Sequence, residues 1–344
     1  MPDLSPPRVT DGGVTWWIPL EEAPGGVRIE VDWILPGNPE FTLSGATWTY
    51  YLRRPAARRL EYRLILRDRD GQGDPGLDPT NPRHIGNPFG DRSVIEFADY
   101  AQPDWVGTAP DGDLEAIDVA PGRLGRTIPA RLWTPIDLNL DEPAPLLVAH
   151  DGSGLASDAA LLGWATWHCT VRRKLRVLLL DPAPGCRDAW YSANEDYADD
   201  EVDVLLAAVR TRVAVSGTVG LGISLGALAT LALQRRRPDA YDAVVLQSGS
   251  FFTPQTDPQE SGYGQFDQVC RAVRSIKATR PARPVPALIT CGAIEENLLN
   301  NIELAQALRT QGYGVEWKVV GDAHTMTGWR DAWVPELDQL IDLV

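Results

Sequence analysis

Histidine and cysteine are scarce in this chain, and their scarcity limits the chemistry that it can support. The sequence has 344 residues but four cysteines and four histidines. No C-x-x-C pair occurs, and the cysteines and histidines do not show the spacing of zinc ligands. We therefore expect no metal site and no disulfide framework, and we expect all four cysteines to be reduced: Cys169, Cys186, Cys270 and Cys291.

Positive charge and long apolar runs are also limited. The chain has 32 basic and 47 acidic residues, a formal net charge of −15. Because nucleic acids and anionic membrane surfaces are bound by clustered Lys and Arg, neither is expected as a partner. No apolar run reaches the roughly 18 residues of a membrane span, and no basic segment followed by an apolar stretch opens the sequence. These features predict a cytoplasmic protein, and no protein partner is evident.

The pattern of apolar residues changes near residue 110. Before it, short segments alternate between apolar and polar residues and are separated by Gly, Pro and Asp, as in "VRIEVDWIL" (27–35) and "LEYRLILRD" (60–68). This pattern is typical of antiparallel strands in a β-sandwich. We therefore predict an immunoglobulin-like β-sandwich domain over residues 1–112 and a second domain over 113–344.

The second domain is predicted to be an α/β fold. Continuous apolar runs bounded by turn residues indicate strands that are buried on both faces, and amphipathic segments such as "LGALATLALQRRR" (225–237) indicate helices after them. The predicted strands lie at 144–152, 175–183, 218–224, 241–249 and 286–292.

Ser224 lies at the end of one predicted strand, directly before a predicted helix. The sequence there is Gly222-Ile223-Ser224-Leu225-Gly226, a G-x-S-x-G pattern whose glycines permit a tight turn that exposes the serine hydroxyl. Gly220 and Gly222 also suggest a dinucleotide-binding turn. That reading is disfavoured because the spacing is G-x-G-x-x-x-G and Asp242 begins, rather than ends, the next strand. Ser224 is therefore predicted to be a nucleophile.

A serine nucleophile needs a base and a group that orients the base. In α/β hydrolases the chain order is serine, acid, histidine, so His324 is the one histidine that can serve. The acid is expected after the strand at 286–292, where Glu295 and Glu296 stand. Asp322 is too close to His324 along the chain to reach the far ring nitrogen. The alternative interpretation of the two glutamates is a helix N-terminus, where acidic residues are favoured by the helix dipole.

Acyl transfer also requires hydrogen-bond donors for the developing oxyanion. The backbone N–H of Leu225, directly after the serine, is one candidate. The other is expected from the loop "HDGSG" after an earlier strand, with the amide of Ser153 or Gly152 as the candidate.

Six segments together resemble the enterochelin (enterobactin) esterase family, which is related to esterase-D-like α/β hydrolases. In chain order they are "HDGSG", "RDAWYSANEDYADD", "GISLGALATLAL", "LQSGSFF", "CGAIEENLLNN" and "GDAHTMTGWRDAW". The first third of the chain is similar to the N-terminal sandwich of that family. The sequence departs from the family at Leu225, where many relatives have Met or Gln, and at "GDAH" (321–324), where G-G-H is common.

The resemblance implies a serine carboxylic ester hydrolase that cleaves a catecholate siderophore trilactone through an acyl-enzyme. It implies Ser224 as nucleophile, His324 as base and Glu295 as acid, with no cofactor. Whether Glu295 completes a triad or the other two act as a dyad stays open. An acyltransferase, a feruloyl-type or acetyl-type carbohydrate ester hydrolase, or a non-catalytic binding module are the alternatives.

Loops near the predicted site carry an arginine and several aromatic rings that suit an anionic aromatic ester. Arg187 opens an R-x-x-x-Y segment that the family shares, and it could meet an anionic oxygen. The rings could stack on catechol groups or simply pack the loops. The predicted substrate-binding residues are Arg187, Trp190, Tyr191, Phe251, Tyr263 and Phe266.

Overall fold

The computed structural model describes residues 5–87 and 90–344, and these residues divide into two compact units. The first unit contains the chain up to Gln102 together with two later segments, Gly292–Glu296 and Val320–Gly328. The second contains Pro103–Cys291, Asn297–Val319 and Trp329–Val344. The division near residue 102 precedes the predicted domain boundary at 112, because the strand Gly112–Ala116 (β10) already belongs to the sheet of the second unit.

The first unit is built from two antiparallel sheets. Their inward residues, such as Trp16, Ile18 and Leu64, form one buried cluster because side chains alternate between the two faces of each strand. One sheet has the order β1 (Arg8–Thr10), β2 (Gly13–Pro19), β5 (Thr47–Arg53), β4 (Thr42–Ser44). The other has the order β3 (Gly26–Glu30), β6 (Arg59–Arg67), β9 (Arg92–Glu96), β8 (His84–Ile85), and β7 (Pro75–Gly76) pairs with β6.

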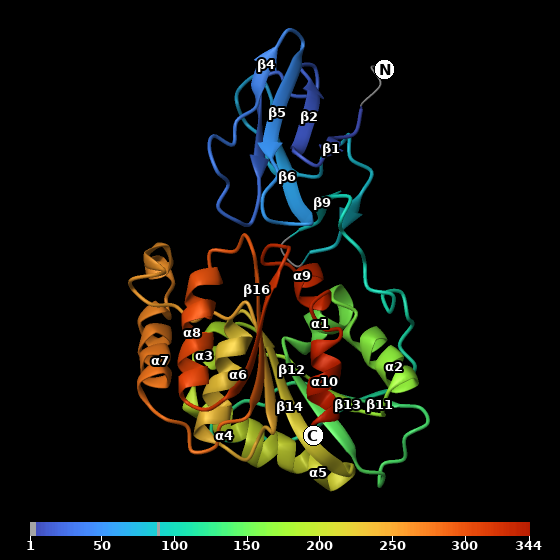
Figure 1. Ribbon diagram of the computed structural model, residues 1–344, viewed down its shortest axis with the longest axis vertical. Coiled ribbons are helices and arrows are strands. Elements are labelled where there is room, and N and C mark those ends of the chain that lie inside the picture. The colour runs from blue at the N-terminus through green and yellow to red at the C-terminus, as the bar shows by residue number, and fades with distance from the viewer. Residues whose placement is uncertain (1–4, 88–89) are drawn as a thin grey trace. The chain divides into compact units, whose positions relative to one another are not determined.

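The second unit contains an eight-stranded mixed sheet, visible between the helices in Figure 1. β12, β14, β15 and β16 pair in parallel, and each is almost wholly buried, as the continuous apolar runs predict. The sequence analysis did not identify β10 and β11. The order is β10 (Gly112–Ala116), β11 (Ala130–Pro135), β13 (Arg176–Leu180), β12 (Ala144–His150), β14 (Val215–Ile223), β15 (Ala243–Gln247), β16 (Pro286–Gly292), β17 (Gly314–Val320).

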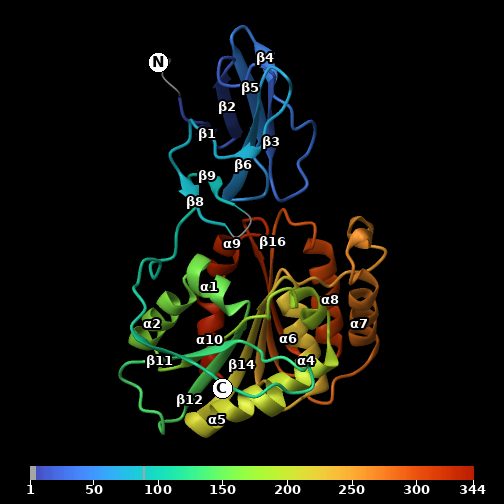
Figure 2. The same cartoon turned by 180° about the vertical axis from the view of Figure 1, so that it is seen from behind.

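Helices cover both faces of this sheet, as Figures 1 and 2 show from opposite sides. On one face lie α1 (Gly152–Asp158), α2 (Leu161–Val171) and α10 (Glu336–Asp342); His168 of α2 bonds Asp338 of α10 at 2.8 Å. On the other lie α3 (Arg187–Tyr191), α4 (Glu195–Asp200), α6 (Leu225–Arg236), α7 (Phe266–Ala278) and α8 (Leu298–Thr310). Short elements complete the unit: a π-helical segment (Glu201–Leu206), α5 (Ala207–Arg212), a 3₁₀ turn (Pro258–Gly262) and α9 (Met326–Arg330).

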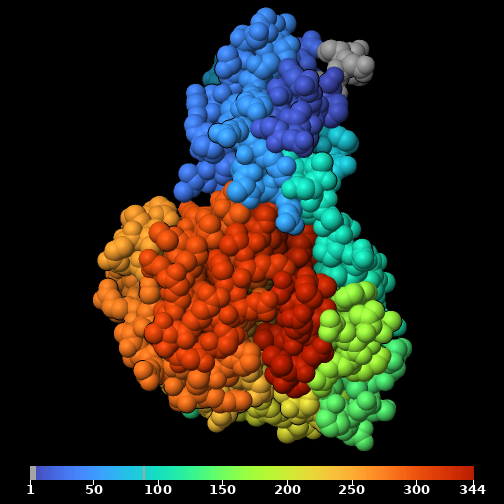
Figure 3. Space-filling model, in the orientation of Figure 1, coloured from blue at the N-terminus to red at the C-terminus, as the bar shows by residue number. Residues whose placement is uncertain are grey.

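The C-terminal third of the chain, orange to red in the space-filling view, forms most of one face of the second unit (Figure 3). Among the described residues, no helix is long and apolar enough to cross a bilayer. Within the same residues, no cluster of His, Cys, Asp and Glu is suited to a metal ion.

Helix α8 offers a direct test of the core. Leu304 is 0% exposed and Leu299 is 54% exposed on the same helix. Leu304→Ala is expected to lower the free energy of unfolding by about 2 to 5 kcal/mol, because it removes buried methyl groups and leaves a cavity. Leu299→Ala is expected to change it by less than about 1 kcal/mol. Chemical denaturation of both variants checks this, and equal losses would contradict the assigned burial.

Candidate active site

Ser224 occupies a strained turn between β14 and α6. Its φ is 53° and its ψ is −124°, a conformation that residues other than glycine rarely adopt. The neighbouring glycines explain how it is tolerated: a Cβ on Gly222 would lie 2.2 Å from the carbonyl oxygen of Gly226. Strand β14 and helix α6 can therefore approach closely only with glycine at 222. This is the geometry of a nucleophile elbow.

Backbone hydrogen bonds hold the turn on both sides. The Ser224 N–H donates to the carbonyl oxygen of Gln247 at 2.9 Å, and the Ser250 N–H donates to the carbonyl oxygen of Ser224 at 3.1 Å. Leu225 begins α6, so its N–H belongs to the first turn of the helix, where N–H groups have no acceptor within the helix. An anion beside Ser224 would find that N–H and the positive end of the helix dipole.

Glu295 and His324 form a hydrogen-bonded pair. They lie in the two later segments of the first unit, Gly292–Glu296 and Val320–Gly328, in the loops after β16 and β17. The Nδ1 atom of His324 lies 2.8 Å from Oε2 of Glu295. The Glu295 side chain is 1% exposed, and its other oxygen, Oε1, accepts the N–H of Gly292 at 2.7 Å. A buried carboxylate held in this way favours the tautomer with the proton on Nδ1, which leaves Nε2 as the basic nitrogen. Glu296, the other glutamate considered from the sequence, is exposed.

The sheet topology explains why these loops are relevant to Ser224. Glu295 follows β16 and His324 follows β17, and the N–H of Ala293 donates to the carbonyl oxygen of Val320 at 2.7 Å. The two strands therefore end side by side. Since β14, β15 and β16 are parallel neighbours, β14 ends at the same edge of the sheet. Chemistry in open α/β sheets is found at this carboxyl edge.

The structure separates the two predicted donors of the "HDGSG" loop. The amide of Ser153 already donates to Oδ1 of Asp181 at 2.9 Å, and its hydroxyl donates to the other oxygen of Asp181. The assignment of Ser153 as an oxyanion donor is therefore corrected, because its N–H is engaged. Gly152 is buried, and a Cβ there would lie 2.6 Å from Cα of Leu179, so the position requires glycine.

The aromatic residues predicted to contact substrate lie mainly in the core. Four of the five rings are 8% exposed or less, and Tyr263 alone among them is partly exposed. Tyr191 packs edge-on against the ring of His150, and burial raises its pKa well above the usual value. A ring covered in this way has no free face for a ligand. The prediction of direct stacking is therefore corrected for Trp190, Tyr191, Phe251 and Phe266.

Arg187 is held by a carboxylate. Its Nε and Nη2 donate to the two oxygens of Asp151 at 2.9 and 2.7 Å, and its guanidinium lies over the Tyr191 ring. Burial disfavours the charged form, but the hydrogen bonds and charge of Asp151 outweigh it and raise the pKa of Arg187. The side chain is 39% exposed. Part of its charge is thus offset, and its remaining N–H groups stay accessible to an anionic or carbonyl oxygen.

Sequence reasoning missed the buried network behind this pair. His150 Nε2 lies 3.0 Å from Oε2 of Glu201, and His150 Nδ1 lies 3.0 Å from the hydroxyl of Thr230. Tyr241 donates to the other oxygen of Glu201. Because both ring nitrogens are engaged and the residue is 0% exposed, His150 cannot act as a base. No local sequence signal marks this network, because Glu201 stands in the acidic run "DDEVD" (199–203) and looks like a solvent-exposed residue.

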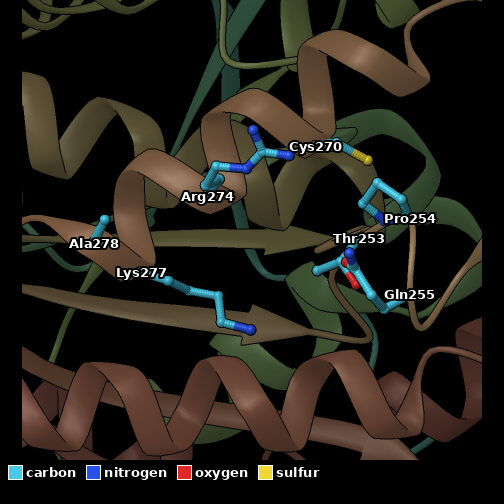
Figure 4. Close-up of a pocket in the computed structure, with 7 residues that line it drawn as sticks. All are labelled: Thr253, Pro254, Gln255, Cys270, Arg274, Lys277 and Ala278. Carbon is cyan, nitrogen blue, oxygen red and sulfur yellow. The ribbon is translucent and has the colours of Figure 1, made fainter.

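The loop after β15, in the part that follows Phe251 and Phe252, lines a pocket of about 360 Å³ with helix α7 (Figure 4). Figure 4 shows Thr253, Pro254 and Gln255 on the loop side and Arg274 and Lys277 on the helix side. Arg271 lines a different pocket, together with Arg235, Arg236 and Arg280. Arg271 and Arg274 therefore line two different pockets.

The fold defines a class of protein. A largely parallel sheet with helices on both faces, and a serine at a strained strand-to-helix turn, is the α/β-hydrolase fold. No family model and no curated protein matches the sequence.

Solved structures extend the likeness to both units. Enterobactin esterase from Shigella flexneri, determined in the presence of enterobactin, has a TM-score of 0.74 at 22% identity, covering 98% of this chain and 94% of that chain. Ferric enterobactin esterase from Salmonella typhimurium has a TM-score of 0.74 at 21% identity, covering 97% of this chain and 96% of that chain. A ferulic acid esterase has a TM-score of 0.56 at 15% identity, covering 68% of this chain and 100% of that chain. The predicted resemblance to enterochelin esterases is confirmed for the fold.

The strained turn predicts that one added methyl group at residue 222 lowers the reactivity of Ser224. Gly222→Ala should slow the labelling of Ser224 by a fluorophosphonate roughly 10²-fold, because the turn must shift to relieve the contact with Gly226. Gly264→Ala is the matched control, since a Cβ there meets nothing within 4 Å. Labelling rates of both variants, with circular dichroism to confirm folding, provide the measurement; wild-type labelling of Gly222→Ala would refute the assigned geometry.

Proposed function

We propose that the protein is a serine carboxylic ester hydrolase. The observation that carries the proposal is the hydrogen bond of 2.8 Å between Glu295 and His324, in loops that follow strands neighbouring the one that presents Ser224. A buried carboxylate on Nδ1 of a histidine is the arrangement that turns Nε2 into a general base for a serine. Glu295 is suited to this role because it is buried and because its hydrogen bond with Gly292 fixes its orientation.

The proposed reaction proceeds through an acyl-enzyme. Nε2 of His324 takes the Ser224 proton while Oγ attacks the ester carbonyl carbon, and the imidazolium is stabilised by Glu295. The amides of Leu225 and Gly152 hold the oxyanion. Collapse of the tetrahedral intermediate breaks the bond to the alcohol, which leaves with the proton from His324. Water, deprotonated by the same nitrogen, then attacks the acyl-enzyme and releases the acid.

Removal of either reacting side chain should abolish turnover. Ser224→Ala and His324→Ala are each expected to lower kcat by roughly 10⁴ to 10⁶, because members of such a set act as a unit. Hydrolysis of a nitrophenyl ester by purified, folded variants measures this. Substantial turnover in either variant would overturn the hydrolase assignment and favour a non-catalytic binding module.

Glu295 and Glu296 are adjacent, so the same substitution at each position tests which glutamate acts as the acid. Glu295→Gln is expected to lower kcat more than about tenfold, because a neutral amide no longer stabilises the imidazolium. Glu296→Gln should leave kcat near wild type, since this side chain is exposed. The ratio of the two kcat values is the measurement. Equal activity of the two variants would instead describe a Ser224–His324 dyad.

For the substrate, we propose a catecholate trilactone siderophore or its linear fragments. Support comes from the likeness in fold to enterobactin esterase over nearly the whole chain, and from the accessible N–H groups of Arg187. The same likeness supports an immunoglobulin-like sandwich for the two N-terminal sheets, and a cytoplasmic location remains our expectation. A feruloyl-type carbohydrate ester is the second candidate, because a ferulic acid esterase shares the hydrolase fold.

A side-by-side kinetic comparison distinguishes the substrate classes. The trilactone, with and without iron, a feruloyl sugar ester and a nitrophenyl acyl ester are compared by kcat/KM. The trilactone is expected to have the highest value and the nitrophenyl ester a lower one, because only the trilactone provides anionic and catechol oxygens for Arg187. A preference for the sugar ester would move the assignment to the second candidate. Transfer of the acyl group to an added alcohol in place of water would indicate an acyltransferase.

A further inference from the structure

A buried arginine of the first unit contacts the loop that carries His324. Arg59 lies in β6, and its side chain is 3% exposed. Its Nη1 donates to Oε1 of Glu61 at 2.7 Å and lies 3.6 Å from Oδ2 of Asp322. Asp322 is two residues before His324 and is itself 3% exposed. One guanidinium therefore serves two buried carboxylates.

The backbone beside Arg59 fixes the same loop. The N–H of Arg58 donates to the carbonyl oxygen of Gly321 at 2.7 Å. Oδ1 of Asp322 accepts the N–H of Ala323 at 2.7 Å, so the carboxylate also shapes the residue next to His324. Arg58, just before β6, and Arg59, its first residue, thus hold residues 321 and 322 by one backbone bond and one ion pair. The loop that supplies the base is anchored immediately before the base.

The surroundings of Asp322 leave the loop little freedom. A Cβ on Gly328 would lie 2.9 Å from Cβ of Asp322, and one on Gly292 would lie 2.4 Å from its carbonyl oxygen. Ile294, next to Glu295, packs against the core of the N-terminal sheets. Both loops of the Glu295–His324 pair are therefore packed within the first unit, and a shift of Asp322 must be transmitted to its neighbours.

Electrostatics make Arg59 necessary at this place. Burial disfavours the charged form of Arg59, but the charges of Glu61 and Asp322 more than compensate and raise its pKa. Without the guanidinium, Glu61 and Asp322 would both lose the cation that these contacts provide while their carboxylates stay buried. Such groups take up a proton or move toward water. Movement of Asp322 would displace the backbone at Ala323 and His324.

We propose that Arg59 is a positioning residue for the base: through Asp322 it holds His324 in the place where it serves Ser224. The proposal rests on the proposed hydrolase function. It assigns to the N-terminal sheets a part in the rate of the reaction.

The test separates positioning from stability. Arg59→Met is expected to lower kcat about tenfold to a hundredfold with KM within about threefold of wild type, because the base is misplaced while ground-state contacts remain. Arg59→Lys should recover part of the loss, since it keeps a cation between the carboxylates. Arg92→Met is the matched control: Arg92 is also buried in the first unit, and its partner is Asp32, outside the loop. It should lower Tm and leave kcat unchanged.

Asp322→Asn keeps the proposal testable if Arg59→Met does not fold. Arg59 stays paired with Glu61 in this variant, and the amide oxygen can still accept the N–H of Ala323. A roughly tenfold loss of kcat is expected, and the double variant should lose no more than the worse single one. Wild-type kcat in folded Asp322→Asn, or a loss in Arg92→Met as large as in Arg59→Met, would overturn the proposal. Activity in Ser224→Ala would instead overturn the hydrolase function itself.

Discussion

The backbone conformation of Ser224 is the constraint around which the second unit is organised. A positive φ at a residue with a side chain is unfavourable, so the surrounding structure has to impose it. Ser248, at the end of the neighbouring strand β15, also has a positive φ, and Gln247 before it accepts a hydrogen bond from the Trp333 indole at 2.8 Å and donates to the Trp329 carbonyl oxygen at 3.0 Å. The C-terminal segment thus holds the end of β15, and the backbone bond from Ser224 to Gln247 ties the serine to that strand end.

Buried and partly buried charges around the candidate site occur in compensated sets. Glu295 is satisfied by His324 and Gly292, Glu201 by His150 and Tyr241, and Arg187 by Asp151. Buried ion pairs add little net stability, because the desolvation of two charges offsets their attraction. Their effect here is on geometry: the hydrogen bonds of each set restrict how the strand ends that carry its members can be arranged. Geometry rather than stability explains why so many polar groups are placed in this part of the interior.

The sequence predicted the parts of the fold whose signals are local. Apolar runs located the central parallel strands. The G-x-S-x-G pattern and chain order led to the prediction of Ser224, His324 and an acid after β16, and in the structure Glu295 lies 2.8 Å from His324. Strands β10 and β11 were missed because neither is a continuous buried run: β10 is largely exposed, and β11 mixes buried with partly exposed residues. The burial of Trp190 and Phe251 could not be foreseen, because an aromatic residue in a loop reads the same whether it packs inward or faces solvent. The contact of Arg59 with Asp322 joins residues far apart in sequence, and no local pattern marks it.

The three residues of the proposed catalytic set do not all belong to the same unit of the chain. Ser224 belongs to the unit of the eight-stranded sheet, whereas Glu295 and His324 belong by their contacts to the unit of the N-terminal sheets. The loops that carry them nevertheless leave from β16 and β17, strands of the same sheet as β14. Each loop is therefore constrained twice, at its ends by the register of the large sheet and along its length by packing against β6 and the N-terminal core. In the proposed reaction, this double constraint leaves His324 less freedom to lose, and such preorganisation is what a general base requires.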